Sequence, residues 1–231
     1  MKRLLLILLL WPMLANAEPL RLEAQGGICE HGLAANGIWH NDAYPEQIDL
    51  RSPCWQLSLS QAPWRYGNWS LGWRLAYVEL GRYKADTVFP MRDDEAHIGI
   101  KGDDCRPETR HGCLGRGRIN GRTRGGSIGA LAERAVGSFT LGIEGGAYVY
   151  YNYFMVTITA YPDESRFDSA KAKWGDIHAT PYLGITARYK YLFSTIRGYG
   201  HVRAGEHNCS GCSGITHGPA YQATIGIQYE F

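Results

Sequence analysis

The C-terminal segment, residues 221–231, alternates apolar and polar side chains without a break. Tyr221, Ala223, Ile225, Ile227, Tyr229 and Phe231 have one parity, and Gln222, Thr224, Gly226, Gln228 and Glu230 have the other. Because successive side chains of a strand point to opposite faces, the pattern predicts a β-strand with one apolar and one polar face. A soluble β-sandwich would bury the apolar face, whereas a membrane barrel would turn it toward lipid.

The same alternation predicts eight strands along the chain. Their clearest residues are 20–25, 55–60, 71–77, 127–134, 139–149, 183–190, 194–202 and 221–231, and the fourth has the weakest pattern. In the seventh, Ile196 and Val202 are both expected on the apolar face. The clearer strands approach the ~9–11 residues that a tilted strand needs to cross a bilayer.

The connections between these strands alternate in length. Residues 28–53, 84–126, 157–179 and 204–217 form the longer ones, whereas 63–68, 135–138 and the turn at Tyr191 are short. A barrel with both termini in the periplasm is expected to alternate short and long connections in this way, because its periplasmic turns are short and its outer loops are long. A secreted sandwich has no physical reason to produce it. The sequence therefore predicts an all-β protein, an eight-stranded antiparallel up-and-down transmembrane β-barrel.

The N-terminus indicates export. Residues 1–17 combine two basic residues, a leucine-rich run and a final Ala-Asn-Ala box, the pattern of a signal peptide cleaved before Glu18. An N-terminal membrane anchor is the alternative, but the apolar run is shorter than the ~20 residues that a spanning helix requires. We expect a signal peptide at 1–17 and one outer-membrane β-barrel domain at 18–231.

The net charge argues against one class of partner. The formal charge is +2, and loss of Lys2 and Arg3 with the signal peptide brings it to 0. A chain without a global basic excess lacks the electrostatic footprint of a nucleic-acid-binding protein. We therefore expect no nucleic-acid partner, and any electrostatic function is expected to be local.

The chain has 6 cysteines, which in an exported protein predict disulfides. They form three sequence-local pairs: Cys29 with Cys54, Cys105 with Cys113, and Cys209 with Cys212. Other pairings are possible, but each of these pairs lies within or at the edges of one predicted outer loop. His207 and His217 give the last pair a spacing that zinc could also use, although an oxidising compartment favours the disulfide. We expect no metal and no cofactor.

These features resemble the eight-stranded outer-membrane barrels, such as the transmembrane domain of OmpA and the OmpX/Ail-like proteins. The resemblance covers nearly all of the mature chain and rests on the signal peptide, the strand rhythm and the C-terminal IGIQYEF segment. It implies a location in the bacterial outer membrane, among its lipids. The final aromatic Phe231 is similar to the signal that the barrel-assembly machinery recognises in that group. We expect a monomer, without the peptidoglycan-anchoring domain of OmpA.

Charged residues recur on the polar parity. They are Arg21, Glu23, Arg74, Glu144, Arg188, Lys190, Arg197 and Glu230. Eight strands enclose an interior just wide enough for side chains to fill. Because an unpaired buried charge is costly, opposite charges in that interior are expected to pair. We interpret these residues as a structural salt-bridge core, with an ion or proton path as the alternative.

Four arginines stand among glycines in residues 113–127: Arg116, Arg118, Arg122 and Arg124. The glycine spacing misses the dinucleotide-binding fingerprint. Arginine forks nevertheless suit phosphate, and the lipopolysaccharide of the outer leaflet is densely phosphorylated. We predict that these arginines lie in the second outer loop and bind lipopolysaccharide or another surface polyanion. A solvated loop balanced by nearby carboxylates is the alternative.

The sequence contains no recognisable catalytic motif, so we predict no catalytic residue. Some small outer-membrane barrels are lipid A acyltransferases or deacylases with a histidine and a serine at the rim, but the His-x-Ser arrangement of the deacylases is absent here. Glu206, His207 and Ser210 share a loop, which is a poor support for catalytic geometry. We predict a non-enzymatic surface-interaction or envelope protein that contacts lipopolysaccharide, a host or a phage. A lipid A-modifying enzyme is the alternative.

Overall fold

The computed structural model describes residues 19–32, 46–90, 114–161, 170–204 and 216–231. The strands are β1 (Arg21–His31), β2 (Glu46–Asp49), β3 (Arg51–Tyr66), β4 (Trp69–Pro90), β5 (Leu114–Val136), β6 (Phe139–Tyr161), β7 (Ala170–Tyr189), β8 (Leu192–Ala204) and β9 (Thr216–Glu230). The signal peptide expected at 1–17 lies outside the described residues. Within the described ranges, no helix is long and apolar enough to cross a membrane.

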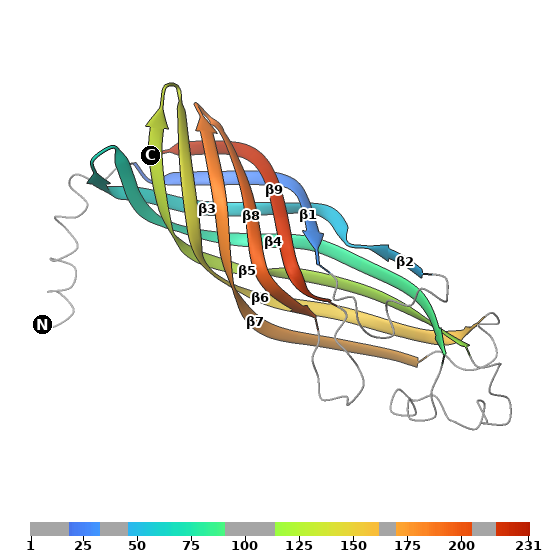
Figure 1. Cartoon of the computed structure of the whole chain (residues 1–231). Helices are drawn as coiled ribbons and strands as arrows, with labels where there is room; N and C mark the ends of the chain where they lie inside the picture. Colours follow the sequence, from blue (N-terminus) through green and yellow to red (C-terminus); the bar gives the residue numbers. More distant parts are fainter. Residues whose placement is uncertain (1–18, 33–45, 91–113, 162–169, 205–215) are drawn as a thin grey trace, which may run out of the picture.

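Eight of these strands close into one antiparallel barrel (Figure 1). The pairing order is β4-β3-β1-β9-β8-β7-β6-β5, and hydrogen bonds between β4 and β5 complete the ring. The first strand of the chain, β1, pairs along its full length with the last strand, β9. The predicted all-β, eight-stranded up-and-down fold is therefore confirmed.

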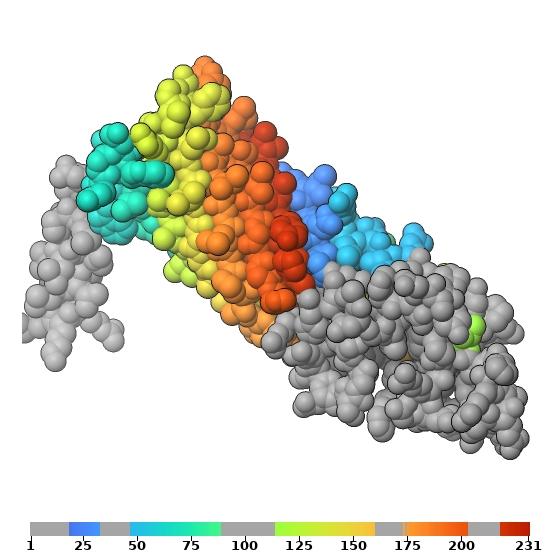
Figure 2. Space-filling view, in the orientation of Figure 1, coloured from blue at the N-terminus to red at the C-terminus, as the bar shows by residue number. Residues whose placement is uncertain are grey.

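Three two-residue turns join neighbouring strands at one end of the barrel, which we call the turn end. They lie at Gly67–Asn68, Gly137–Ser138 and Lys190–Tyr191, within the short connections that the sequence predicted. Gly67 and Gly137 have φ of 59° and 61°, the left-handed conformation that tight hairpins require and glycine adopts without steric cost. The teal tip of the β3–β4 turn stands apart, whereas the yellow tip of the β5–β6 turn and the orange tip of the β7–β8 turn lie side by side (Figure 2), and Phe231 hydrogen-bonds Leu20 at the same end.

Strands at the opposite end are longer than the sequence pattern indicated. β4, β5, β6 and β7 have 22, 23, 23 and 20 residues, whereas β1 has 11 and β8 has 13. The loop limits predicted at 84–126 and 157–179 are therefore wrong, because β4 to β7 continue through much of both. Together with β2, which pairs with β4 and was not predicted, they form a sheet that extends beyond the barrel (Figure 1). We call this the extended end.

The barrel turns its apolar parity outward and its polar parity inward. Ile128 and Ile225 are 59% and 63% exposed, whereas Gln56 and Thr224 on the inward parity are 1% and 6% exposed. Aromatic side chains border this outward apolar band: Trp64, Trp69, Phe139, Tyr189, Tyr229 and Phe231 near the turn end, and Trp55, Tyr77, Tyr151, Tyr153 and Tyr221 toward the extended end. An apolar belt between two aromatic girdles is the architecture of an outer-membrane β-barrel, and it places the chain in that membrane.

One inward and outward assignment made from the sequence is wrong. The register of β8 against β9 shifts between Tyr199 and His201. Because a bulge inserts one extra residue, it reverses the faces of the residues that follow. Val202 is consequently buried inside the barrel at 2% exposure instead of facing lipid, and His201 is exposed.

Candidate functional site

Two connected groups of ion pairs fill the part of the barrel interior that is nearer the turn end. Glu144 on β6 accepts hydrogen bonds from Arg74 Nη1 and Arg197 Nε, both at 2.5 Å. Arg74 Nη2 also lies 3.1 Å from Glu23 Oε1. In the second group, Glu133 accepts from Arg188 Nη2 at 2.5 Å and from Arg21 Nη1 at 2.6 Å. The pairing expected of the buried charges is therefore confirmed.

The composition of this core differs from the sequence prediction in three residues. Arg21, Glu23, Arg74, Glu144, Arg188 and Arg197 are buried as predicted. Lys190 and Glu230 are exposed at the turn end, because the strands finish there. Glu133 was missed, because the pattern of β5 is weak. Phe193 packs against both groups. Its ring centre lies 4.7 Å from the guanidinium of Arg74 and 5.4 Å from the guanidinium of Arg188.

From the ion pairs toward the extended end, the residues that fill the interior are aromatic and apolar. Tyr148, Tyr150, Tyr182 and Tyr199 pack there with Val78, Leu80, Val202 and the disulfide between Cys29 and Cys54. The predicted pairing of these two cysteines is confirmed, with Cα atoms 5.7 Å apart. Both are buried inside the barrel, where they join β1 to its neighbour β3. The other predicted disulfide cysteines, Cys105, Cys113, Cys209 and Cys212, lie outside the described residues.

The four arginines singled out from the sequence lie on strand β5, so their predicted position in a loop is wrong. β5 pairs with β4 and β6 over this whole segment. Gly115, Gly117 and Gly121 occupy inward, buried positions, where space is limited: a Cβ on Gly121 would lie 1.9 Å from the ring of Tyr83. The intervening arginines therefore point outward. The glycine and arginine pattern, which we interpreted as a loop, belongs to a strand whose inward side chains are small and whose outward side chains are cationic.

The outward face of β4 adds two further cations beside β5. Arg82 is paired with Arg122, and Lys84 with Asn120. We define the arginine wall as Arg82, Lys84, Arg116, Arg118, Arg122 and Arg124, together with the carboxylates of Glu79 and Asp86. Six cations and two carboxylates leave a local excess of four positive charges, on a chain whose net charge is close to zero.

The two carboxylates hold part of the arginine wall in place. Arg116 donates to Asp86 through Nε at 2.7 Å and Nη2 at 2.8 Å. Arg122 donates in the same two-pronged way to Glu79, at 2.6 and 2.7 Å. Hydrogen bonds from Arg116 are the main reason that the pKa of the Asp86 carboxyl lies below its ordinary value, with further contributions from Arg118. Asp86 therefore stays ionised in mildly acidic conditions.

The arginine wall begins where the apolar belt ends. Arg124 is paired with Tyr151 of the aromatic girdle, and Arg122 with Tyr153. On the other side, Glu79 is paired with Trp55. From that row the cations continue along β5 toward the extended end. The aromatic girdle marks the membrane interface, so the arginine wall begins at the headgroup depth of the leaflet on the side of the extended end and continues beyond it.

The residues considered for catalysis or zinc from the sequence, Glu206, His207, Ser210 and His217, are not brought into a described site. The first three lie outside the described residues, and His217 lies on β9, where it is paired with Arg203 of β8. In the described part of the chain, no cluster of three or more potential metal ligands occurs.

The likeness of this chain to known proteins was found among solved structures. No protein-family model matches the chain, and no curated protein sequence does. The solved structures similar to it include Ail of Yersinia pestis, crystallised with the heparin analogue sucrose octasulfate, at 8% identity and TM-score 0.43, covering 92% of this chain and 100% of Ail. OprG of Pseudomonas aeruginosa has 10% identity and TM-score 0.43, covering 94% and 98%. The outer membrane protease OmpT of Escherichia coli has 12% identity and TM-score 0.41, covering 93% and 97%.

Proposed function

We propose that the protein is a non-enzymatic outer-membrane barrel that binds phosphate groups of lipopolysaccharide through the arginine wall. The observation that carries the proposal is the outward direction of the arginines at headgroup depth. Cations in a distal loop would face solvent, whereas cations on the barrel wall stand beside the lipids themselves. Arginine suits phosphate because its planar guanidinium donates two parallel hydrogen bonds.

Part of the arginine wall is available to a ligand. Within the described residues, no ion pair joins Arg82, Lys84 or Arg124 to a carboxylate. Arg122 pairs with Glu79 yet keeps 42% of its side chain exposed, whereas Glu79 is 5% exposed. Glu79 therefore lies beneath Arg122 and orients it, which lowers the conformational cost of binding an anion, whereas the Asp86 side chain is about as exposed as that of Arg116 and competes with a ligand for it.

Two partner assignments belong to the same proposal. β9 ends the barrel on the outward aromatic Tyr229 and the terminal Phe231, the segment that we propose the barrel-assembly machinery recognises. The ring closes with a single chain, which fits a monomer in the membrane.

The first test removes cations that make no ion pair. The triple variant Arg82→Gln, Lys84→Gln and Arg124→Gln is expected to weaken lipopolysaccharide binding by roughly tenfold at low salt, because each exposed phosphate contact contributes about 0–1 kcal/mol. The difference should shrink as salt rises, because exposed charges are screened. Calorimetric titration of purified barrel with lipopolysaccharide measures both effects.

A matched control and a rescue complete this test. Arg65→Gln removes an exposed arginine of β3 at the turn end, where it is paired with Ser70 and lies far from the arginine wall, and this variant should bind as the wild type does. Lysine in place of Arg116, Arg118, Arg122 and Arg124 should keep only part of the affinity that glutamine at those positions removes, because lysine lacks the fork. Unchanged binding by the triple variant at low salt would refute the proposal.

A second prediction runs in the opposite direction. Asp86→Asn is expected to strengthen lipopolysaccharide binding by roughly two- to fivefold, because Arg116 and Arg118 lose a competing carboxylate. The lowered pKa of Asp86 means that this competition persists at mildly acidic pH, so the gain should be the same at pH 5 and pH 7. The same titration measures it, and weaker binding by Asp86→Asn would show that the carboxylate's role is to position the arginines.

A further inference from the structure

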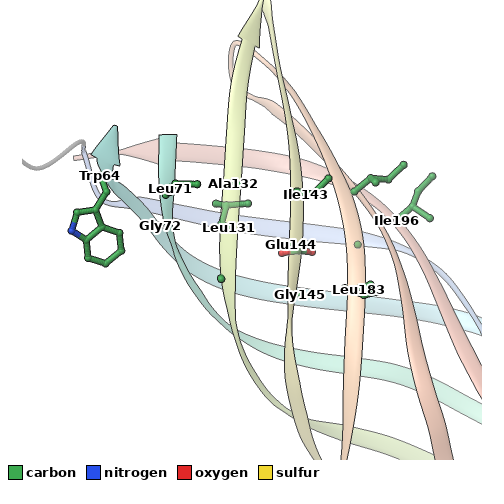
Figure 3. A pocket seen from close by; sticks show the side chains of 13 residues that line it. Trp64, Leu71, Gly72, Leu131, Ala132, Ile143, Glu144, Gly145, Leu183 and Ile196 are labelled. Atoms are coloured by element: carbon green, nitrogen blue, oxygen red, sulfur yellow. The ribbon is translucent and has the colours of Figure 1, made fainter. Parts of the chain in front are cut away.

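The lipid-facing wall contains a groove below the arginine wall, nearer the turn end. A hollow of about 900 Å³ lies over β3 to β8 (Figure 3). Its floor is made by the small residues Ala130, Ala132 and Gly145, of which Ala130 and Gly145 are paired across β5 and β6. Larger side chains, among them Trp64, Leu71 and Leu183, stand around this floor. The depression exists because three outward positions on two neighbouring strands carry little or no side chain.

A second hollow continues the first toward the turn end. It has a volume of about 450 Å³ and shares the lining residues Ile143, Ile185 and Ile196 with its neighbour, and we call the two adjoining hollows together the wall groove. The second hollow adds Trp69 and Arg134. The wall groove therefore runs from an apolar floor in the membrane to a cation beside an interfacial tryptophan.

Arg134 is the feature that distinguishes the wall groove from a bare apolar depression. It occupies an outward position on β5, paired with Trp69 on one side and Leu141 on the other. In the described structure no ion pair joins Arg134 to a carboxylate. An arginine on a lipid-facing wall is costly unless it lies near the interface or meets an anion. Its location predicts a negatively charged group at this end of the wall groove.

The length of the wall groove fits within one leaflet. Arg134 and Ala130 are four residues apart on β5, which at about 3.4 Å per residue separates them by roughly 14 Å. The hydrocarbon core of a bilayer is about 30 Å thick and the strands that cross it are tilted by about 45°, so this separation spans roughly 10 Å of depth, which lies within one leaflet. The turn end is the periplasmic end of such a barrel, and the leaflet concerned is therefore the periplasmic one.

We propose that the wall groove binds one glycerophospholipid of the periplasmic leaflet, with its phosphate on Arg134 and one acyl chain over Ala130, Ala132 and Gly145. The phosphate compensates the cation, and the chain fills a depression that the protein's own side chains leave open. A second barrel in the wall groove would leave Arg134 without an anion. The site is separate from the arginine wall, which lies at the other membrane interface, so either proposal can fail without the other.

The test is native mass spectrometry of the full chain purified in mild detergent, with phospholipids identified in the released fraction. The wild type should retain one glycerophospholipid per barrel. Arg134→Gln should lower the retained fraction roughly tenfold, as expected for the loss of a charge-assisted contact, and Arg134→Lys should restore part of it. Ala130→Phe fills the floor and should also abolish retention.

Ala147→Phe is the matched control. Ala147 is outward on β6 and exposed, but it does not line the wall groove, so this variant should retain lipid like the wild type. Heat-modifiable gel migration establishes that each variant is folded before it is compared. Equal retention by Ala130→Phe and Ala147→Phe would overturn the proposal. Retention of lipopolysaccharide alone, or a mass of two barrels that Ala130→Phe abolishes, would overturn it in favour of another occupant.

Discussion

Glu144→Leu is expected to destabilise the folded barrel by about 3–5 kcal/mol, the range for removing one partner of a buried ion pair. Glu144 is the shared acceptor of Arg74 and Arg197, and both guanidiniums have 0% side-chain exposure. Leucine preserves most of the volume but leaves the Arg197 guanidinium without a counter-charge and Arg74 with Glu23 alone. Urea titration in detergent, followed by heat-modifiable gel migration, measures the loss as a lower midpoint.

The control for this prediction is an ion pair of the same chemistry in water. Glu30→Gln removes the partner of Arg51, whose side chain is 74% exposed. Exposed pairs contribute about 0–1 kcal/mol, so the midpoint should hardly move. If Glu144→Leu behaved like Glu30→Gln, the interior would have to be hydrated enough to solvate Arg74 and Arg197, and the interpretation as a structural core would be wrong.

Alternation predicted those strands whose outer face meets lipid and whose inner face is polar. β6 and β9 are such strands, and their parity was assigned correctly over residues 139–149 and 221–231. The pattern failed where the environment changes. Beyond the girdle the outer face meets headgroups and water, so apolar residues are no longer required there, and the extended parts of β4 to β7 lack the signal. The bulge in β8 has no signature in alternation, because it depends on its pairing with β9.

The candidate site was predicted in composition but not in position. Four arginines among glycines identified the cation-rich segment correctly, yet its strand conformation depends on β4, which supplies both hydrogen bonds and the ring of Tyr83 opposite Gly121. Arg82 and Lys84 were missed for the same reason, because only the pairing of β4 with β5 places them beside the arginines of β5. The wall groove is a still less local feature. Ala130, Ala132 and Gly145 are unremarkable in sequence and form a floor only when β5 and β6 are aligned.

Ile128→Arg is expected to reduce the yield of folded barrel and to cost about 2–4 kcal/mol, the range for arginine on a lipid face near the bilayer midplane. Ile128 is 59% exposed, outward, and paired with Leu75 and Ala147 within the apolar belt. It is four residues from Arg124 and six from Arg134 along β5, so a new guanidinium there lies far from either interface. Folding into phospholipid vesicles, followed by urea titration, measures both yield and stability.

Thr140→Arg supplies the comparison on the other face of the wall. Thr140 points inward on β6 at the turn end, where it lines an open cavity of about 750 Å³ beside Arg21, Arg188 and Glu230. An added guanidinium has room and water there, although the neighbouring arginines make the position electrostatically unfavourable. The cost should therefore stay within about 1 kcal/mol, the scale of exposed charge interactions.

The assignment of residues to the inside and outside of the barrel underlies both the arginine wall and the wall groove. If Thr140→Arg reduced the folded yield as much as Ile128→Arg does, that assignment would be wrong and both lipid sites would fail with it.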